Sequence, residues 1–515
     1  MPSNLAYVND DGFSHNDRTQ DSYSHIPYGV ANRTPQSKGI RHPQHRYITV
    51  AILCFINLIN YMDRYTIAGI LDDVQKYYSL GNTEGGLLQT SFVVSYMIMA
   101  PVFGYLGDRY SRKYIIAFGV TFWSVTTLAG SFIPSNLFGI FIFLRALVGT
   151  GEASYSTIAP TIIADLFSKD LRSKMLAIFY FAIPVGSGLG YIVGDRVAKA
   201  FQAWQWALRI TPALGLLSVV LTLLYVREPP RGEAEGGGSL KATPLKSDLI
   251  ELFKIKSFVF STLGFTSVTF ATGALAWFGP KYMELAISMQ STGNTKSNAA
   301  LIFGLITCIA GIVGVIIGSA SSQYLRRSNA RADPLICAFG VLGSVPLIYA
   351  GVVLADRSLT CAWILIFLGE VFLCVNWTIV ADILLYVIIP TRRSIAEAVQ
   401  ILVSHALGDA SSPYIIGIVS DIILKAKNPA IDDFLSLQYS MYIPTGVLVL
   451  GAFFFFMTAL YIEKDKSKCS LVTHANVNIN ENHSCYTVPI IHDKSLNKKG
   501  EYSHTAHENQ TITVL

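Results

Sequence analysis

Three ionisable residues, Asp63, Arg145 and Glu152, interrupt long apolar runs in the first third of the chain. A charged side chain at the centre of a bilayer costs at least about 2.5–3.5 kcal/mol, so packing alone gives no reason for it. On helices that rise 1.5 Å per residue, Asp63 and Arg145 reach similar depths, about 10 and 12 Å below one membrane surface. Glu152 lies two turns from Arg145 on the same helix face. This spacing predicts a proton-binding site built around an ion pair, or a static network that fixes helix register.

A second group of ionisable residues lies in two apolar runs near the carboxyl end: Glu370, Asp382, Glu397, His405 and Asp409. His405 and Asp409 are four residues apart and therefore face the same way on a helix. A histidine beside a carboxylate can exchange protons in the pH range of an acidic organelle, although a neutral, hydrogen-bonded core histidine is the alternative. Glu370 lies in mid-run and is a better candidate for lining a cavity than Asp382, which is near the end of its run.

The composition indicates which elements hold these residues. Of 515 residues, 51% are hydrophobic and 14% are charged, whereas soluble globular domains carry about 25% charged residues. We therefore expect a polytopic membrane protein. The seven cysteines show no C-x-x-C spacing, so we expect neither a zinc site nor a disulfide framework. The amino terminus lacks a basic start followed by an apolar core, so the first span would act as its own insertion signal.

Twelve mostly apolar stretches have the length of about 20 residues that crosses a bilayer as a helix. They cover 47–70, 88–106, 114–133, 137–163, 172–195, 204–226, 257–280, 299–321, 334–355, 360–388, 395–423 and 438–462. The longest connection, which is rich in charge, glycine and proline, separates the sixth span from the seventh. The predicted parts are an N-terminal tail (1–46), a six-helix bundle (47–226), a linker (227–256), a second six-helix bundle (257–462) and a C-terminal tail (463–515).

Basic residues give the orientation of these spans. Connections after even-numbered spans carry 17 lysines and arginines, whereas those after odd-numbered spans carry 8. Because positive charge is enriched on the cytosolic side, the sequence predicts that the even-numbered connections and both tails are cytosolic.

The connection after the second span packs one acid and three bases into a tight turn, Gly104-Tyr-Leu-Gly-Asp108-Arg109-Tyr-Ser-Arg112-Lys113. Such a turn can lock neighbouring helix ends through charge-assisted hydrogen bonds that break when the helices part, or it can serve only as a topology anchor. The pattern resembles the cytosolic signature of the major facilitator superfamily, with Ser111 in place of the usual glycine. Gly318 followed by Tyr324-Leu325-Arg326-Arg327 resembles a weaker copy in the second half.

Further motifs resemble the Spinster family of that superfamily. They are Ile56-Asn-Leu-Ile-Asn60-Tyr-Met-Asp63-Arg64, Gly149-Thr-Gly151-Glu152-Ala-Ser-Tyr-Ser-Thr-Ile-Ala-Pro160, Ile183-Pro-Val-Gly-Ser-Gly-Leu-Gly190-Tyr, Val380-Ala-Asp382-Ile-Leu, Ile389-Pro-Thr-Arg-Arg393-Ser and His405-Ala-Leu-Gly-Asp409-Ala-Ser-Ser-Pro413-Tyr. The resemblance covers about residues 45–465 and is strongest to the lysosomal branch that transports lysophospholipids. Asp63 supports this branch, because the branch that exports sphingosine-1-phosphate departs from an acid there.

The resemblance implies an all-α major facilitator fold with 12 transmembrane helices in two pseudo-symmetric bundles. It implies a transporter, not an enzyme, that carries lysophosphatidylcholine or lysophosphatidylethanolamine from the lysosome or late endosome to the cytosol by alternating access. A sphingosine-1-phosphate or sphingolipid exporter is the alternative, and a receptor or scaffold without transport is a third.

Residue roles follow from that expectation. Arg145 would bind the substrate phosphate, and Asp63, Glu152 and Glu370 would line the substrate site. Protons, the only cofactor expected, would be carried by Asp63, Glu152, His405 and Asp409. Gly104, Asp108, Arg109, Arg112 and Lys113 would gate the cytosolic side. We expect a monomer in a lipid bilayer, with no metal and no nucleic-acid partner.

Overall fold

A computed structural model describes residues 43–167, 169–229, 245–290, 298–389, 392–426 and 432–484. Within these ranges the chain is helical and contains no strand. Most of the two predicted tails and residues 230–244 of the predicted linker lie outside them. The side chain of Asp108 also lies outside the described part, although its backbone belongs to a helix.

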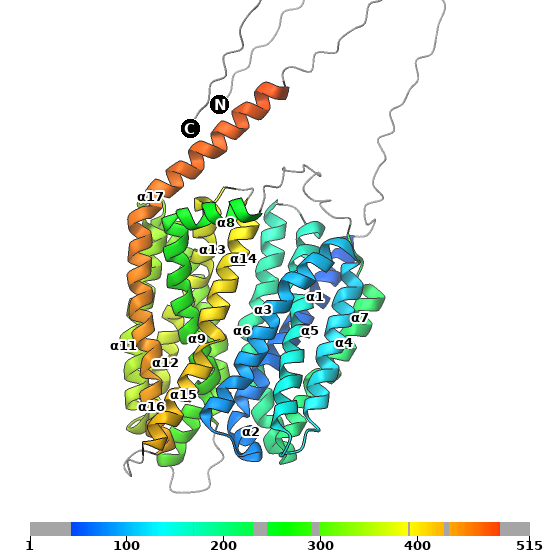
Figure 1. Ribbon diagram of the computed structural model, residues 1–515, viewed down its shortest axis with the longest axis vertical. Coiled ribbons are helices and arrows are strands. Elements are labelled where there is room, and N and C mark those ends of the chain that lie inside the picture. Colours follow the sequence, from blue (N-terminus) through cyan, green and yellow to red (C-terminus); the bar gives the residue numbers. More distant parts are fainter. Residues whose placement is uncertain are drawn as a thin grey trace, which may run out of the picture. The chain divides into compact units, whose positions relative to one another are not determined.

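The first half of the chain forms one bundle (Figure 1, blue to teal). Its elements are α1 (Pro43–Gly69), α2 (Leu71–Tyr78), α3 (Asn82–Arg109), α4 (Arg112–Gly130), α5 (Phe138–Leu166), α6 (Lys169–Phe201), the short η1 (Trp204–Trp206) and α7 (Ala207–Tyr225). Apolar side chains on all sides of these helices are typical of membrane spans.

The second half forms the other bundle (Figure 1, green to orange). Its elements are α8 (Leu245–Lys254), α9 (Lys256–Gln290), α10 (Ala299–Leu325), α11 (Ala332–Val353), η3 (Leu354–Asp356), α12 (Leu359–Cys374), α13 (Asn376–Val387), α14 (Arg393–Ser404), the π-helical turn η5 (His405–Asp409), α15 (Ser412–Lys425), α16 (Asp433–Ser440) and α17 (Tyr442–Ser484).

Each predicted span coincides with a helix or with consecutive helices, but several are divided. The tenth breaks at Val375 between α12 and α13, and the eleventh contains the π turn η5. The helix α17 continues to Ser484, past the predicted end of the last span. By length and composition, nine stretches of the described chain qualify as membrane spans. The long helices outside that set are α1, α4 and α5, and α1 and α5 carry Asp63, Arg145 and Glu152 in their interiors.

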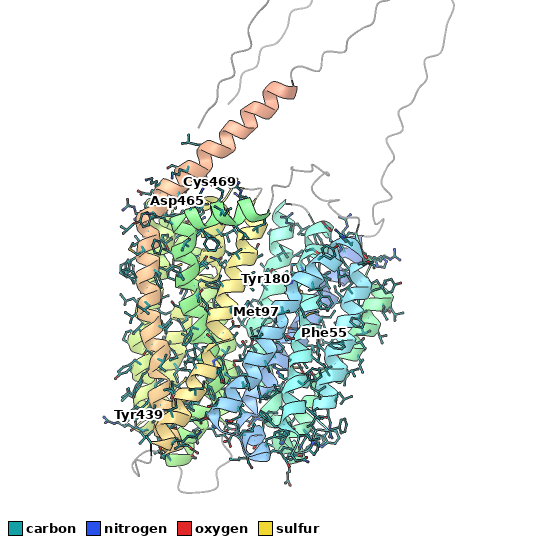
Figure 2. All side chains as sticks on the ribbon, in the orientation of Figure 1. Phe55, Met97, Tyr180, Tyr439, Asp465 and Cys469 are labelled. Atoms are coloured by element: carbon teal, nitrogen blue, oxygen red, sulfur yellow. The ribbon has the colours of Figure 1, made fainter. Side chains whose placement is uncertain are left out.

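The two ends of the bundles are named here by the short helices found there. The α8 end carries α8 and the α3–α4 connection, and the α2 end carries α2 and α16 (Figure 1). Asp465 lies near the first and Tyr439 near the second (Figure 2). Figure 2 also shows Met97 and Tyr180 where the bundles face each other.

Glycines on α6 and α10 form one of the close contacts between the two bundles. A Cβ atom added to Gly188 would lie 2.4 Å from the carbonyl oxygen of Gly304, and one added to Gly304 would lie 2.5 Å from that of Gly188. No other residue type fits at these positions without movement of a backbone. Small residues thus let the two halves pack backbone to backbone, as is common between membrane helices.

Candidate functional site

Asp63 lies fully buried inside the first bundle, where three other helices supply its partners. Its Oδ1 accepts a short hydrogen bond from the hydroxyl of Thr211 on α7, and its Oδ2 accepts one from Thr127 on α4 at 3.2 Å. Arg145 of α5 completes the set, because its NH1 lies 3.9 Å from Oδ2. The structure therefore brings together the two residues whose depths the sequence matched.

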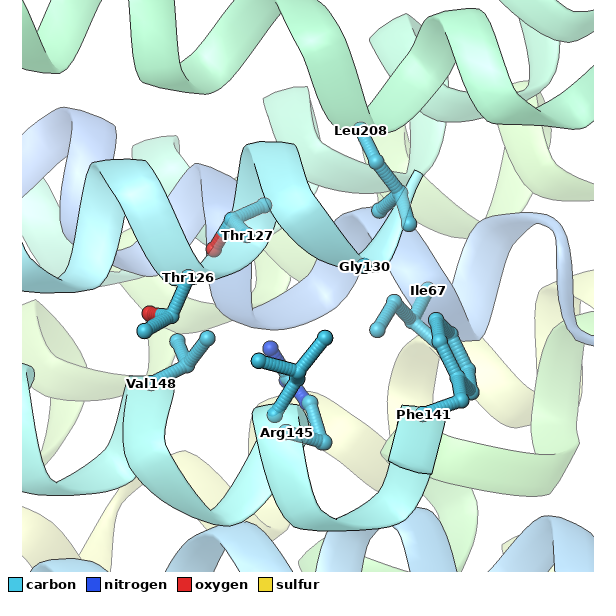
Figure 3. Close-up of a pocket in the computed structure, with 9 residues that line it drawn as sticks. Ile67, Thr126, Thr127, Gly130, Phe141, Arg145, Val148 and Leu208 are labelled. Atoms are coloured by element: carbon cyan, nitrogen blue, oxygen red, sulfur yellow. The ribbon is translucent and has the colours of Figure 1, made fainter. Parts of the chain in front are cut away.

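Arg145 is enclosed as well as paired. Its NH2 donates to the backbone oxygen of Arg64 at 3.1 Å, and its guanidinium lies 4.4 Å from the ring centre of Phe92. Figure 3 shows the cavity beside it, which has a volume of about 10 Å³. That volume is enough for about one water molecule, so in this conformation the Asp63–Arg145 pair is closed to any larger ligand.

Arg64, which follows Asp63 directly, is the residue that sequence reasoning missed. Consecutive residues point about 100° apart on a helix, so Arg64 faces the second half while Asp63 faces its own bundle. Its NH2 lies 3.7 Å from Oδ2 of Asp409, and its guanidinium lies 4.9 Å from the ring centre of Phe92. Among the described residues, its buried Nε and NH2 atoms have no hydrogen-bond partner. The sequence feature that could have indicated Arg64 is the presence of two adjacent ionisable residues, Asp63 and Arg64, inside one predicted span.

His405 and Asp409 lie together on the wide turn η5. The Nδ1 atom of His405 is 2.8 Å from Oδ1 of Asp409, while the other carboxylate oxygen faces Arg64. The ring of Tyr96, from α3, lies 6.1 Å from the imidazole. Single π turns inside α-helices are frequent at functional sites, and this one places a carboxylate between a histidine of its own half and an arginine of the other.

Glu152 is also buried, at 1% exposure, and its Oε1 has no hydrogen-bond partner within the described part of the chain. The charges that act on it are those of Arg64, Asp63 and Arg145. We call the resulting set the charge network: Asp63, Arg64, Arg145, Glu152, His405 and Asp409. With His405 neutral, three carboxylates and two guanidinium groups leave one negative charge without a counter-charge. A buried uncompensated charge is costly, and a bound proton would balance it.

Glu370 lies apart from the charge network. It belongs to α12, and the neighbours that interact with it electrostatically or by a hydrogen bond are Thr307, Tyr191 and Cys374. No described interaction joins it to Asp63, Arg145 or Glu152. Its role in substrate binding stays a prediction.

In the signature loop, Arg112 makes most of the described contacts. Its NH1 lies 2.6 Å from Asp165 of α5, and its Nε lies 3.2 Å from Glu228, which follows α7. Ser111 also donates to Glu228 at 2.7 Å. Burial acts to raise the pKa of Glu228, but the hydrogen bonds from Ser111 and Arg112 outweigh it and hold that pKa below its ordinary value. Arg112 therefore ties α4 to two neighbours within the first half.

The other residues of the signature loop make fewer contacts. Arg109 is exposed and lies 4.1 Å from the ring centre of Tyr105, while a Cβ added to Gly104 would meet no atom within 4 Å. Lys113 is half-buried, and the side chain of Asp108 is outside the described part. Their gating roles stay predictions.

The weaker copy of the loop in the second half repeats the arrangement around Arg112. Arg326 lies 2.8 Å from Asp333 and 2.9 Å from Asp382. Each half therefore has an arginine at its α8 end that pairs with two carboxylates. Asp382 belongs to this arrangement and not to the charge network.

The two halves are joined at the α2 end by polar contacts that the sequence did not predict. Asp421 of α15 accepts hydrogen bonds from the backbone N–H groups of Asn82 and Thr83 at 3.0 and 2.8 Å. Trp277 of α9 donates to the backbone oxygen of Gly85 at 2.9 Å, and Lys281 donates to Asn82 at 2.7 Å. Across the described residues, hydrogen bonds and ion pairs between the halves lie from mid-span to the α2 end. This conformation is therefore closed at the α2 end.

Comparisons with known proteins agree with this architecture. Residues 53–396 match the Major Facilitator Superfamily. The chain is 52% identical to Protein spinster homolog 1 of Mus musculus, over 86% of this chain and 85% of that one. It is 49% identical to Protein spinster of Drosophila melanogaster, over 86% and 81%. A bacterial homologue of the human lysosomal transporter Spinster, crystallised in an inward-facing and occupied conformation, has the same fold, with a TM-score of 0.69 at 20% identity over 82% of this chain and 99% of that one.

Proposed function

This chain is a multi-pass membrane transporter of the Spinster family in the major facilitator superfamily, and from that premise we propose that it exports lysophospholipids from the lysosome to the cytosol together with protons. The single observation that carries the proposal is the charge network, which crosses the interface between the two halves through Arg64 and Asp409. A network that spans the interface must change when the halves rock, so its protonation and the conformation are coupled.

Protonation of Asp63 is the first proposed step. Asp63 is the only ion-pair partner of Arg145 among the described residues, and a neutral Asp63 would release that guanidinium. The freed guanidinium could then bind the substrate phosphate through two parallel hydrogen bonds. Glu152 would hold a proton in the same network, and His405 would exchange one with Asp409. Proton binding would thereby prepare the phosphate site.

Arg64 and Arg145 are the proposed phosphate ligands. Both guanidinium groups contact the ring of Phe92, so they lie close together, and both have buried nitrogen atoms without a hydrogen-bond partner in the described structure. A lysophospholipid phosphate would supply acceptors for these donors. Arg64 would meet the substrate first, because it faces the second half while Arg145 is enclosed.

The single acyl chain requires an apolar wall near these arginines. Tyr180 of α6 is about half exposed where the bundles face each other (Figure 2), and Glu397 of α14 acts on it electrostatically across the interface. Ile401 and Leu402 of α14 are also exposed, at 44% and 49%. We propose that the acyl chain lies along α6 and α14 or extends between helices into the bilayer.

The proposed orientation places the α8 end in the cytosol, because the excess of basic residues lies there. The conformation closed at the α2 end is then the one that releases substrate to the cytosol. A lysosomal location is supported by the strongest motif resemblance and by the bacterial relative, which is described as a homologue of a lysosomal transporter.

Transport by purified protein in lipid vesicles tests the proposal. Radiolabelled lysophosphatidylcholine should leave an acidic compartment faster than a neutral one, and protein-free vesicles give the background. Sphingosine-1-phosphate in a parallel arm separates the two exporters. Equal fluxes of lysophosphatidylcholine at both pH values would contradict proton coupling, and a flux of sphingosine-1-phosphate alone would contradict the substrate. Absence of both fluxes would contradict both proposed substrates.

A further inference from the structure

A cavity of about 590 Å³ lies at the α2 end, away from the charge network. It is bounded by the first half through the end of α1, α2, α6 and η1, and by the second half through Glu284 of α9. The residues that line it are Gly69, Ile70, Asp72, Asp73, Tyr77, Asp195, Ala198, Lys199, Gln202, Ala203, Trp204, Gln205 and Glu284. The proposed transport mechanism uses none of them.

Negative charge exceeds positive charge around this cavity. Four carboxylates line it, from Asp72, Asp73, Asp195 and Glu284. Lys76 pairs with Asp72, and Lys199 lies 2.5 Å from Oδ1 of Asp195. Within the described part of the chain, Asp73 and Glu284 have no ion-pair partner, so the four carboxylates outnumber the two lysines that pair with them.

Electrostatic repulsion between neighbouring carboxylates affects Asp73. Loss of surrounding water and then the charge of neighbouring Asp72 raise the pKa of Asp73 above its ordinary value. A bound cation would relieve this repulsion.

Two buried polar groups that line the cavity lack partners. Asp195 is 7% exposed, and its Oδ2 has no hydrogen-bond partner among the described residues. Trp204 is 6% exposed, and its indole Nε1 also has no hydrogen-bond partner among the described residues. Buried polar groups in native proteins are normally satisfied, so the Oδ2 atom of Asp195, whose Oδ1 atom pairs with Lys199, can accept one further hydrogen bond from a bound ligand.

The shape of the wall selects the kind of cation. The rings of Tyr77 and Trp204 meet edge to face, with centres 5.4 Å apart, on the same wall as the carboxylates. Aromatic faces beside acidic groups bind ammonium ions, including quaternary ones, through cation–π attraction. In the described residues no group of three or more His, Cys, Asp or Glu side chains is arranged to hold a metal ion. An organic ammonium ion therefore fits this wall, and a metal ion does not.

We propose that this cavity binds an organic ammonium group, either as a free amine or as the ammonium headgroup of a lipid. The cation would lie between the carboxylates of Asp195 and Glu284, with Trp204 and Tyr77 against its methyl or methylene groups. Because Asp195 belongs to the first half and Glu284 to the second, the bound cation holds the halves together at the α2 end. The site goes beyond the transport function, since it exists whether or not the chain moves lysophospholipids.

Equilibrium binding of radiolabelled choline to the purified full-length protein tests this site. Binding should saturate and should be displaced by tetramethylammonium, but not by sodium at equal ionic strength. Asp195→Asn and Glu284→Gln should each weaken it at least tenfold. Asp356→Asn, which removes an exposed carboxylate of η3 that does not line the cavity, should leave it unchanged. Tyr77→Leu, at a 37% exposed position, should also weaken binding and serves if a carboxylate variant fails to fold.

Four lipid or amine probes distinguish the sources of the ammonium group. Displacement of choline by free ethanolamine or tetramethylammonium indicates a site for free amines. Displacement by lysophosphatidylcholine but not by lysophosphatidic acid, together with weak binding of free choline, indicates a headgroup site. Absence of saturable displacement by every ammonium probe would overturn the proposal, as would equal binding by wild type, Asp195→Asn and Glu284→Gln. Because binding is measured without transport, failure here is distinct from failure of the vesicle assay.

Discussion

Asp421 of α15 accepts hydrogen bonds from both the backbone N–H and the hydroxyl of Thr83, at 2.8 and 2.5 Å, and so caps a helix that belongs to the other half of the protein. The first turn of a helix has N–H groups without intrahelical partners, and a side chain at the N-cap position usually satisfies one of them. Here the N-cap residue of α3 is Gly81, which has no side chain. The cap therefore comes from α15, and it exists only while the α2 end is closed.

Removal of this cap should favour the conformation that is open at the α2 end. Loss of an N-cap costs about 1 kcal/mol, which is roughly a fivefold change in the ratio of two states. We expect Asp421→Ala to lengthen the spin-label distance between Lys76→Cys and Tyr439→Cys, placed on opposite halves in a background without reactive cysteines. Asp432→Ala is the matched control, because Asp432 caps α16 within its own half. An unchanged distance distribution in Asp421→Ala would show that this cap does not stabilise closure.

Contact between α6 and α10 gives a second prediction about closure. An alanine at position 188 would place its Cβ 2.4 Å from the oxygen of Gly304, so the helices must separate. Overpacking of this kind costs about 1–3 kcal/mol, and only the closed conformation bears that cost. We expect Gly188→Ala to raise the accessibility of the α2 end in the same spin-label pair. Gly446→Ala adds a Cβ that meets no atom within 4 Å and should behave as wild type. Equal spin-label distances in Gly188→Ala and Gly446→Ala would show that the contact between α6 and α10 does not stabilise closure of the α2 end.

The sequence predicted the fold and the family well because both depend on regular features. Apolar length identifies spans, and helical periodicity gives the depth and face of an ionisable residue. These two rules matched the level of Asp63 with that of Arg145 and placed His405 beside Asp409. The all-helical major facilitator fold is confirmed by the structure and by the family match.

Contacts between the halves were outside the reach of these rules. The approach of Arg64 to Asp409 depends on how α1 packs against η5, and no local pattern encodes that packing. Asp421 was missed for the same reason, since its partner lies 338 residues away in the chain. The cavity at the α2 end requires five elements, α1, α2, α6, η1 and α9, to converge. In each case the residue type indicates what the side chain can bind, but the tertiary structure determines which residue it contacts.

The arginine of the signature loop makes stability depend on pH. The pKa of Glu228 is lowered in the folded state, so its contribution is present above the ordinary Glu value of about 4.3 and is lost as pH falls through the lower folded value. We expect the melting temperature of the wild type to fall on acidification through this range more than that of Glu228→Gln. Scanning fluorimetry in detergent measures both. Asp356→Asn, which alters an exposed carboxylate of η3, is the control. Parallel curves for wild type and Glu228→Gln would remove Glu228 from this role.

Proton coupling through the charge network predicts a specific loss in two amide variants. Asp63→Asn and Glu152→Gln keep the shape of each side chain but replace the titratable carboxyl group with an amide that cannot bind or release a proton in this pH range. We expect both to lose the acceleration of lysophosphatidylcholine transport by acid in the vesicle assay while they remain folded by size-exclusion chromatography. Asp356→Asn changes an exposed carboxylate of η3 outside the charge network and should retain the acceleration. Transport by Glu152→Gln that still rises with acidity would exclude Glu152 as a proton carrier.

The two network arginines decide between phosphate binding and structural pairing. An arginine that binds phosphate loses its bidentate hydrogen bonds when it is replaced by lysine. An arginine that only neutralises a carboxylate needs mainly its positive charge, which lysine keeps. We therefore expect Arg64→Lys and Arg145→Lys to be expressed normally, to bind lysophosphatidylcholine at least tenfold more weakly in detergent and to lose most transport. Arg209→Lys changes an α7 arginine that stacks on Phe132 and Trp206 outside the charge network, and it should retain binding. Near-normal binding by Arg145→Lys with loss in Arg64→Lys would assign the phosphate to Arg64 and leave Arg145 as the counter-charge of Asp63.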